Sequence, residues 1–239
     1  MTELLYQTDS YLKEFDSTVH SVLPEERAIV LDRSAFYPGG GGQPCDFGSL
    51  VVDGTAYLVV RVKKHGEDVL HFLGGEQTLP GPGSAAHGTL DWARRYSLMR
   101  THTALHVLCG TVFRDYGALV TGGDMEPLKG RMDFEFANMR GELVREIESA
   151  VNEEIKKARE IRVRILPREE AFQIPDLIRT KINLLPEGIM QVRTVEIIGL
   201  DLQADGGTHV HNTNEVGSIR VVDYKSKGAI NKRIYMDVQ

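Results

Sequence analysis

Two histidines have the type and spacing of half a metal site. His102 and His106 stand four residues apart in RTHTALHVLC (100–109), so in a helix both imidazoles project from one face. Such a pair can hold zinc, although histidine pairs also occur on packed or exposed helix faces without any metal. The zinc-protease pattern needs a glutamate after the first histidine. Thr103 stands there instead, which excludes that class.

A second segment, ADGGTHVHNTNEVG (204–217), supplies the other half of the predicted site. Asp205 and His209 are also four residues apart, and the two glycines between them permit a tight turn that can present both side chains to a helix. Three histidines and one carboxylate are all acceptable zinc ligands. The predicted ligands are His102, His106, His209 and Asp205.

Two neighbouring residues compete with this set. His211 lies two residues from His209, and we expect it outside the ligand shell or at the surface. Cys109 shares a helical face with His102 and could reach a metal, but three ligands from one helix would strain a tetrahedral site. We therefore expect Cys109 to be a buried free thiol.

A glycine-rich loop, SAFYPGGGGQPCDFG (34–48), is the third segment with chemical potential. Four consecutive glycines cannot form a stable helix or strand, and their backbone amides can bind an anion or a polarised carbonyl. A plain surface turn is the alternative. Gln43 follows the glycines and offers two donors and an acceptor.

The elements that must position these residues fall into two regions. Residues 1–90 show short runs of β-branched residues separated by glycine turns, which predicts a small β-barrel domain carrying the glycine-rich loop. From Asp91 onward, apolar residues at helical spacing (92–116 and 141–160) mix with strand-like segments (131–137, 161–167, 190–199 and 217–238). Residues 91–239 are therefore predicted to form an α+β domain with a mainly antiparallel sheet, and the fold class of the whole chain is α+β.

Composition limits the possible partners. The 239 residues carry a formal net charge of −6, which argues against a broad nucleic-acid surface and against DNA as a partner. No apolar run approaches the ~18 residues of a membrane span, and two cysteines favour a reducing cytoplasm. RNA contacts would need local basic clusters, each of which can also be a plain solvated face. The candidate residues are Arg94, Arg95, Lys225, Lys227, Lys232 and Arg233.

Three runs together resemble a known family: FYPGGGGQPCDFG, RTHTALHVLCG and DGGTHVHNTNEVGSIRV. Their order and spacing are similar to the editing domain of alanyl-tRNA synthetases and to its free-standing relatives, the AlaX-type proteins. The likeness extends from about residue 7 to 238, and the length and amino-terminal module resemble the medium-length class.

The resemblance implies zinc, one ion per chain, and hydrolysis of an ester between an amino acid and the tRNA 3′ end. His102, His106 and His209 match zinc ligands of the family, whereas Asp205 stands where the family usually has a cysteine. The amides of Gly41 and Gly42 and the side chain of Gln43 are then expected to face the developing negative charge. Thr208 is expected to fix a water or the substrate amine, or alternatively to cap the glycine turn.

The expected function is a zinc-dependent, free-standing deacylase of mischarged tRNA-Ala, with Ser-tRNA-Ala as the substrate and Gly-tRNA-Ala as a second candidate. The expected partner is the acceptor end of tRNA-Ala, and no obligate protein partner is inferred. One alternative is the same chemistry on a different aminoacyl-tRNA. The other is a non-catalytic tRNA-binding module with a structural metal, which would have a closed four-ligand site rather than an open position.

Overall fold

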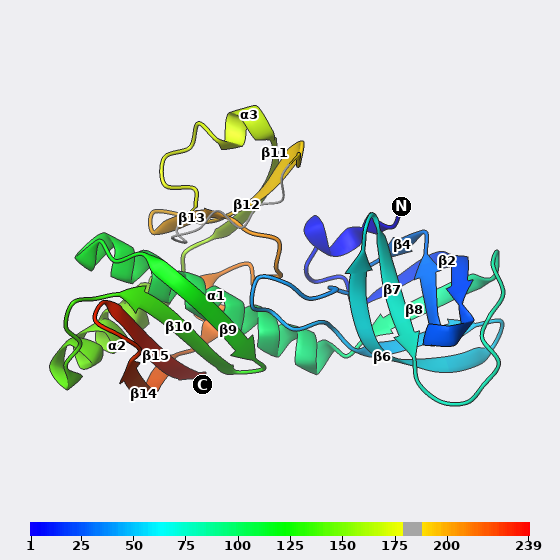
Figure 1. The fold of residues 1–239 in the computed structure, drawn as a ribbon, viewed down its shortest axis with the longest axis horizontal. Coiled ribbons are helices and arrows are strands. Elements are labelled where there is room, and N and C mark those ends of the chain that lie inside the picture. Colours follow the sequence, from blue (N-terminus) through cyan, green and yellow to red (C-terminus); the bar gives the residue numbers. More distant parts are fainter. Residues whose placement is uncertain (179–187) are drawn as a thin grey trace. The chain divides into compact units, whose positions relative to one another are not determined.

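A computed structural model describes residues 1–178 and 188–239 of the chain. The chain divides into two compact units, Met1–Tyr96 and Ser97–Gln239 (Figure 1). The boundary lies within helix α1 (Trp92–Tyr116), whereas the sequence analysis places it at residue 90.

The first unit is a closed six-stranded barrel. Its neighbouring strands all pair antiparallel, in the order β2 (Glu14–Leu23), β3 (Ala28–Leu31), β7 (Asp68–Leu73), β6 (Thr55–His65), β5 (Gly48–Val52) and β8 (Ala85–Leu90). Alternate residues fill the interior, as a half-buried strand requires. Phe15, Leu31, Phe36 and Leu50 are buried there. A short parallel pair, β1 (Glu3–Leu4) with β4 (Arg33–Ser34), lies outside this ring of strands.

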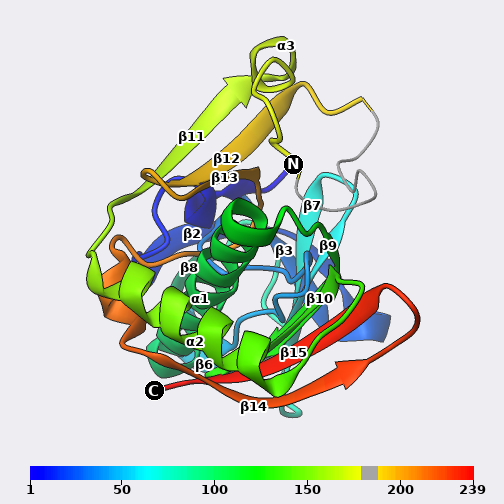
Figure 2. The same cartoon turned by 90° about the vertical axis from the view of Figure 1, so that its left-hand side faces the viewer.

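The second unit contains two antiparallel sheets (Figure 2). The four-stranded sheet has the order β14 (Ile219–Ser226), β15 (Asn231–Val238), β10 (Lys129–Glu135) and β9 (Val120–Glu126). The three-stranded sheet has the order β11 (Ile161–Pro167), β12 (Gln191–Ile197) and β13 (Asp201–Ala204). Barrel and antiparallel α+β unit together confirm the predicted fold class.

Two long helices cover one face of the four-stranded sheet (Figures 1 and 2). Helix α2 (Gly141–Lys156) buries Val144, Ile147, Val151 and Ile155, which recur at the 3–4 residue spacing of an amphipathic helix. Helix α1 ends just before Gly117, because Gly117 takes the left-handed conformation (φ 64°) and its amide donates to the carbonyl of Phe113 at 2.9 Å. A single turn, α3 (Arg168–Ala171), follows β11.

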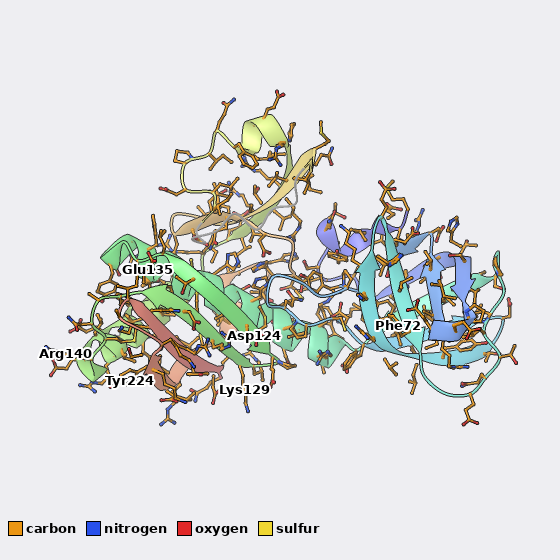
Figure 3. The ribbon with its side chains drawn as sticks, in the orientation of Figure 1. Phe72, Asp124, Lys129, Glu135, Arg140 and Tyr224 are labelled. Atoms are coloured by element: carbon orange, nitrogen blue, oxygen red, sulfur yellow. The ribbon has the colours of Figure 1, made fainter. Side chains whose placement is uncertain are left out.

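The four-stranded sheet is exposed at its margin. Asp124 on β9 and Lys129 at the start of β10 are both solvent-exposed (Figure 3).

Among the described residues, no helix is long and apolar enough to span a bilayer.

Candidate metal centre

Helix α1 presents two imidazoles to the interior of the second unit. His102 and His106 lie one helical turn apart with ring centroids 5.1 Å from each other, and both are buried. This confirms that the pair shares one helix face.

The turn after β13 brings a carboxylate and a third imidazole to that face. Asp205 Oδ2 accepts a hydrogen bond from the amide of Gly207 at 2.7 Å, which fixes the tight turn. The same oxygen lies 3.0 Å from His209 Nε2, and Asp205 Oδ1 lies 3.6 Å from His102 Nε2. The turn therefore folds its carboxylate inward, between two histidines from different elements.

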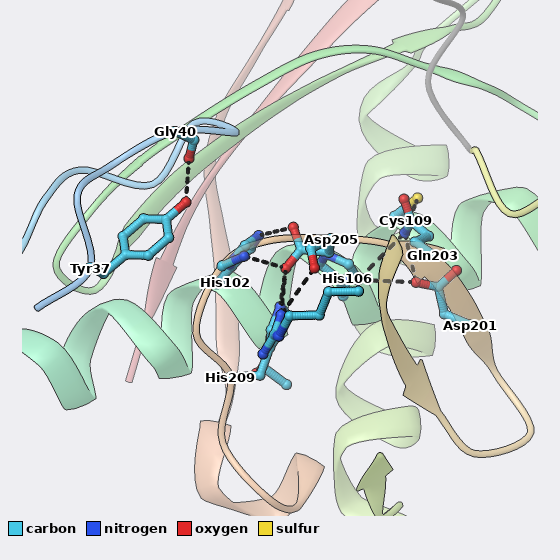
Figure 4. Close-up of polar contacts among 12 residues, drawn as sticks. Tyr37, Gly40, His102, His106, Cys109, Asp201, Gln203, Asp205 and His209 are labelled. Atoms are coloured by element: carbon cyan, nitrogen blue, oxygen red, sulfur yellow. Dashed lines mark hydrogen bonds and ion pairs between the residues drawn. The ribbon is translucent and has the colours of Figure 1, made fainter. Parts of the chain in front are cut away.

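The four side chains form one buried cluster (Figure 4). One ligand atom from each of His102, His106, Asp205 and His209 lies within 4.8 Å of all the others. Four donors in a tetrahedron around zinc, with bonds of about 2.0–2.1 Å, are about 3.3 Å apart. The two measured separations of Asp205 from histidine nitrogens, 3.0 and 3.6 Å, lie on either side of that value. The cluster could therefore bind a metal ion once its more distant donors, which lie within 4.8 Å of one another, approach by up to about 1.5 Å.

The electrostatics of the cluster also suit a metal. Burial lowers the pKa of His102 well below its ordinary value and lowers that of His209 to about 4, so both rings are neutral at pH 7. Burial alone would raise the pKa of Asp205, but His102 and the hydrogen bond with His209 outweigh it and hold this pKa well below its usual range. Neutral imidazoles and an ionised carboxylate are the forms that ligate metals.

His106 differs because a second carboxylate faces its ring. Burial alone would lower its pKa, but a hydrogen bond to Asp201 and the charge of Asp205 outweigh burial and raise it. His106 Nδ1 lies 3.2 Å from Asp201 Oδ2, while His209 Nδ1 lies 3.2 Å from the hydroxyl of Thr103. Asp201 and Thr103 were not among the residues predicted from sequence, because the spacing of ligands says nothing of the groups that hydrogen-bond to them.

The remaining predicted neighbours lie where expected. His211 is exposed and is not part of the cluster, as predicted. Cys109 is a buried free thiol outside the ligand set, also as predicted. Thr208 is fully buried in the turn between Asp205 and His209. Arg193 on β12 places a guanidinium nitrogen 3.7 Å from Asp205 Oδ2, an interaction that the sequence did not predict.

The glycine-rich loop of the first unit is a defined turn. Gly40 and Gln43 exchange backbone hydrogen bonds of 3.0 and 2.9 Å, and Gly41 and Gly42 between them have φ of 58° and 88°. Positive φ at both central positions explains why glycine is needed there. Two of the loop's amides are thus used within the turn, whereas those of Gly41 and Gly42 bind no other described residue. Gln43 itself is buried.

Two of the predicted RNA contacts stand in the first unit. Arg95 is fully buried, donates to both carboxylate oxygens of Asp46 and to the carbonyls of Ser10 and Ala35, and so holds the glycine-rich loop. Its burial is at odds with a phosphate contact. Arg94 is partly exposed, lies 4.1 Å above the ring of Phe47 and donates to the carbonyl of Cys45.

The other four stand on or beside the hairpin of β14 and β15. Lys225 and Lys227 are exposed, and Lys225 pairs with Asp223 at 2.9 Å. Lys232 is buried, and its ammonium donates to two carbonyls of the hairpin turn. Arg233 is mostly buried against Asp133, with nitrogen–oxygen distances of 2.6 and 2.7 Å. Of these four residues, only the two exposed lysines can therefore meet a phosphate without a rearrangement.

Family profiles match a part of each unit. The family profile described as "Threonyl and Alanyl tRNA synthetase second additional domain" matches residues 192–235, which include Asp205 and His209. The profile described as "tRNA synthetases class II (A)" matches residues 7–94, within the barrel unit.

Full-length relatives define the family. The chain is 41% identical to the alanyl-tRNA editing protein AlaX-M of Saccharolobus solfataricus, over the whole of both chains. It is 37% identical to AlaX-M of Methanosarcina barkeri over 98% of each chain. It is also 37% identical to the alanine–tRNA ligase of Pyrococcus furiosus, covering 92% of this chain but 24% of the ligase.

The chain has a β-barrel unit, an α+β unit with a buried cluster of three histidines and an aspartate, and these relatives. Together they place it in the tRNA-editing class of proteins. The chain belongs to the AlaX-M family of alanyl-tRNA editing proteins.

Proposed function

We propose that this protein is a zinc-dependent hydrolase that deacylates mischarged tRNA-Ala in the cytoplasm, with Ser-tRNA-Ala as its main substrate and Gly-tRNA-Ala as a second one. The observation that carries the proposal is the buried cluster of His102, His106, Asp205 and His209, in a chain that matches AlaX-M proteins along its whole length. The ester of an aminoacyl-tRNA is already activated, so the enzyme needs a positioned water and a stabilised oxyanion more than a strong nucleophile.

The four residues of the cluster would hold one zinc ion per chain. When bound, zinc would supply a Lewis acid to a water or substrate group that either adds to the four protein ligands or displaces Asp205. Asp205 is the ligand at which this chain departs from the family pattern, because a carboxylate replaces the usual thiolate. Either group supplies one negative charge, so the charge of the site is preserved. We assign Asp205 as a direct ligand.

The other predicted site residues keep their proposed roles. Thr208, buried between two ligands, is proposed to fix a water or the substrate amine. The amides of Gly41 and Gly42 and the side chain of Gln43 are proposed to stabilise the developing negative charge. The acceptor end of tRNA-Ala is proposed to bind through phosphate contacts of Lys225 and Lys227, with Arg94 as a further candidate.

A deacylation assay tests the proposal. Ser-, Gly- and Ala-tRNA-Ala are incubated with protein as purified, after chelation, and after zinc is restored. We expect rapid loss of serine, slow loss of alanine, no activity after chelation and recovery with zinc. Full activity after complete metal removal would refute the zinc requirement. Stable zinc binding together with tRNA binding but no hydrolysis of any substrate would favour the non-catalytic module.

A further inference from the structure

The partner of His106 determines which of its nitrogens carries the proton. His106 Nδ1 lies 3.2 Å from Asp201 Oδ2, and the side chains of both residues are buried. An ionised carboxylate can only accept hydrogen bonds, so the nitrogen that faces it must be the protonated one. Nε2 is then the nitrogen with a free lone pair. It is the nitrogen that a metal would need.

Gln203 strengthens this arrangement. Its amide Nε2 lies 2.6 Å from Asp201 Oδ2 and 3.4 Å from Cys109 Sγ, so it donates to the same carboxylate oxygen as His106. The amide also lies 3.5 Å from His106 Nδ1, and this longer contact is a hydrogen bond only if Nδ1 is unprotonated. Oδ2 of this carboxylate therefore has two donors, which hold it beside the imidazole.

The corresponding contact of His209 is not equivalent. Its Nδ1 faces the hydroxyl of Thr103, which can either donate or accept and so does not fix the tautomer. Among the described contacts of the three histidines, the Asp201–His106 pair is the one in which a carboxylate outside the four clustered residues faces a ring nitrogen; the Nε2 atoms of His209 and His102 face Asp205 instead, at 3.0 and 3.6 Å.

Gly110 provides the space for this carboxylate. It follows His106 by four residues, so the positions 102, 106 and 110 share one face of α1, and the third has no side chain. A Cβ at Gly110 would lie 2.9 Å from the Cβ of Asp201 and 3.1 Å from the carbonyl oxygen of Leu200. Glycine within a helix costs about 1 kcal/mol relative to alanine. The close approach of β13 explains why glycine stands there.

We propose that Asp201 is a positioning residue for the metal centre: it fixes His106 as the Nδ1-protonated tautomer and directs Nε2 toward the metal, and Gly110 provides the space for it. The inference rests on the proposed metal site but not on the identity of the substrate. Carboxylates that hold a metal-bound histidine typically contribute 10–100-fold to metal affinity.

Metal titration tests the proposal without relying on activity. Zinc alone is titrated into metal-free protein against a coloured chelator, and cobalt(II) absorption reports the geometry. Asp201→Ala should weaken zinc binding about 100-fold, and Asp201→Asn, which keeps an acceptor without the charge, about 10-fold. Asp124→Asn removes an exposed carboxylate on β9 and should leave the affinity unchanged (Figure 3).

A second variant shifts the position of Asp201 without removing any charge or hydrogen-bond donor. Gly110→Ala should displace the start of β13 and weaken zinc binding about 10-fold. Gly123→Ala is the matched control, because a Cβ there would meet its nearest neighbour at 3.8 Å. Wild-type zinc affinity in both Asp201→Ala and Gly110→Ala, with the fold intact by circular dichroism, would overturn the proposal.

Nitrogen-15 NMR of the histidine rings tests the tautomer directly in the metal-free wild-type protein, so the result does not depend on the folding of a variant. We expect the proton of His106 on Nδ1 and the neutral lone pair on Nε2. A neutral ring with its proton on Nε2 would overturn the proposal even if zinc binds. Conversely, absence of zinc binding by a protein that has the expected tautomer would refute the proposed metal-dependent function and the metal-directing role of Asp201, and only its effect on the tautomer of His106 would stand.

Discussion

Replacing Asp205 by alanine should lower the zinc affinity of this protein by more than 100-fold. Asp205 supplies the one anionic group among the four clustered donors, and the Gly207 amide orients its carboxylate from 2.7 Å. Loss of a residue that merely holds a ligand costs about 10–100-fold. Loss of a ligand that also carries the charge should exceed that range, which corresponds to more than about 2.8 kcal/mol at 1.4 kcal/mol per tenfold.

Two further substitutions separate charge from shape. Asp205→Cys returns the thiolate that is usual in the family and should retain the metal, because it keeps one negative charge and one ligand atom. Asp205→Asn keeps the shape but loses the charge, and we expect its affinity to lie between those of the alanine variant and the wild type. Zinc affinity is measured by chelator competition, and deacylation of Ser-tRNA-Ala is measured in parallel.

One result would refute the direct ligation of zinc by Asp205. If Asp205→Ala keeps wild-type zinc affinity but loses deacylation, the carboxylate holds a catalytic water and does not bind the metal. The 3.0 and 3.6 Å distances to His209 and His102 would then reflect hydrogen bonding alone. Loss of zinc and activity together, with recovery of zinc in Asp205→Cys, supports ligation.

Three other variants test separate parts of the molecule. Gln43→Ala should narrow the ratio of Ser-tRNA-Ala to Ala-tRNA-Ala hydrolysis rates, and an unchanged ratio with a slower rate would assign Gln43 to transition-state stabilisation instead. Burial alone would raise the pKa of Glu154, but hydrogen bonds from a lysine and two arginines outweigh it and lower the pKa from 4.5 to about 2. The stabilisation that this ionised group provides is complete above pH 4.5 and disappears as the pH falls toward 2. Glu154→Gln should therefore lower the free energy of unfolding by roughly 3 kcal/mol at pH 7 and weaken its dependence on pH below 4.5, both measured by urea titration. An unchanged dependence on pH would contradict this. Replacing both Lys225 and Lys227 by alanine should raise KM for tRNA several-fold and leave kcat unchanged. It should also reduce the slope of log affinity against log salt concentration by about 1 for each phosphate that the variant no longer neutralises. If the variant and the wild type have equal KM at both low and high salt, these lysines do not bind phosphates.

Local spacing accounts for the part of the site that the sequence predicts well. The four-residue separation places His102 and His106 on one helix face whatever the rest of the fold does, and the glycines between Asp205 and His209 require a turn. The contact between these two segments joins residues far apart in the sequence, so local spacing does not predict it. Sequence supports it only through the ligand types and through the resemblance to a family.

For the predicted basic clusters, local sequence did not predict which side chains are exposed. Arg94 and Arg95 are adjacent in sequence, but successive helix positions point about 100° apart, and Arg95 is buried against Asp46 while Arg94 is partly exposed. Lys232 and Arg233 are adjacent on a strand, where side chains alternate between faces. A run of positive charges therefore predicts a basic surface only after each side chain has been placed on its element.

Two strands escape prediction for a different reason. Strand β9 (VTGGDME) contains two glycines and lacks apolar alternation, so its conformation depends on pairing with β10. Strand β13 has four residues and no β-branched side chain, and it is held by β12. Both are strands because of their neighbours and not because of their own propensity.

The positions 102, 106 and 110 carry a signal that could have located the missed carboxylate. A glycine one turn after two candidate ligands, in a helix interior where alanine would be more stable by about 1 kcal/mol, indicates that another segment approaches the helix at that point. A metal-binding histidine requires a partner at its second nitrogen, and the approaching segment is where that partner should be sought. The pattern His-x₃-His-x₃-Gly in this chain thus predicts the position of the supporting group, and the acid nearest Gly110 is Asp201. The identity of that acid still needed the fold, because Asp201 is more than ninety residues away along the chain.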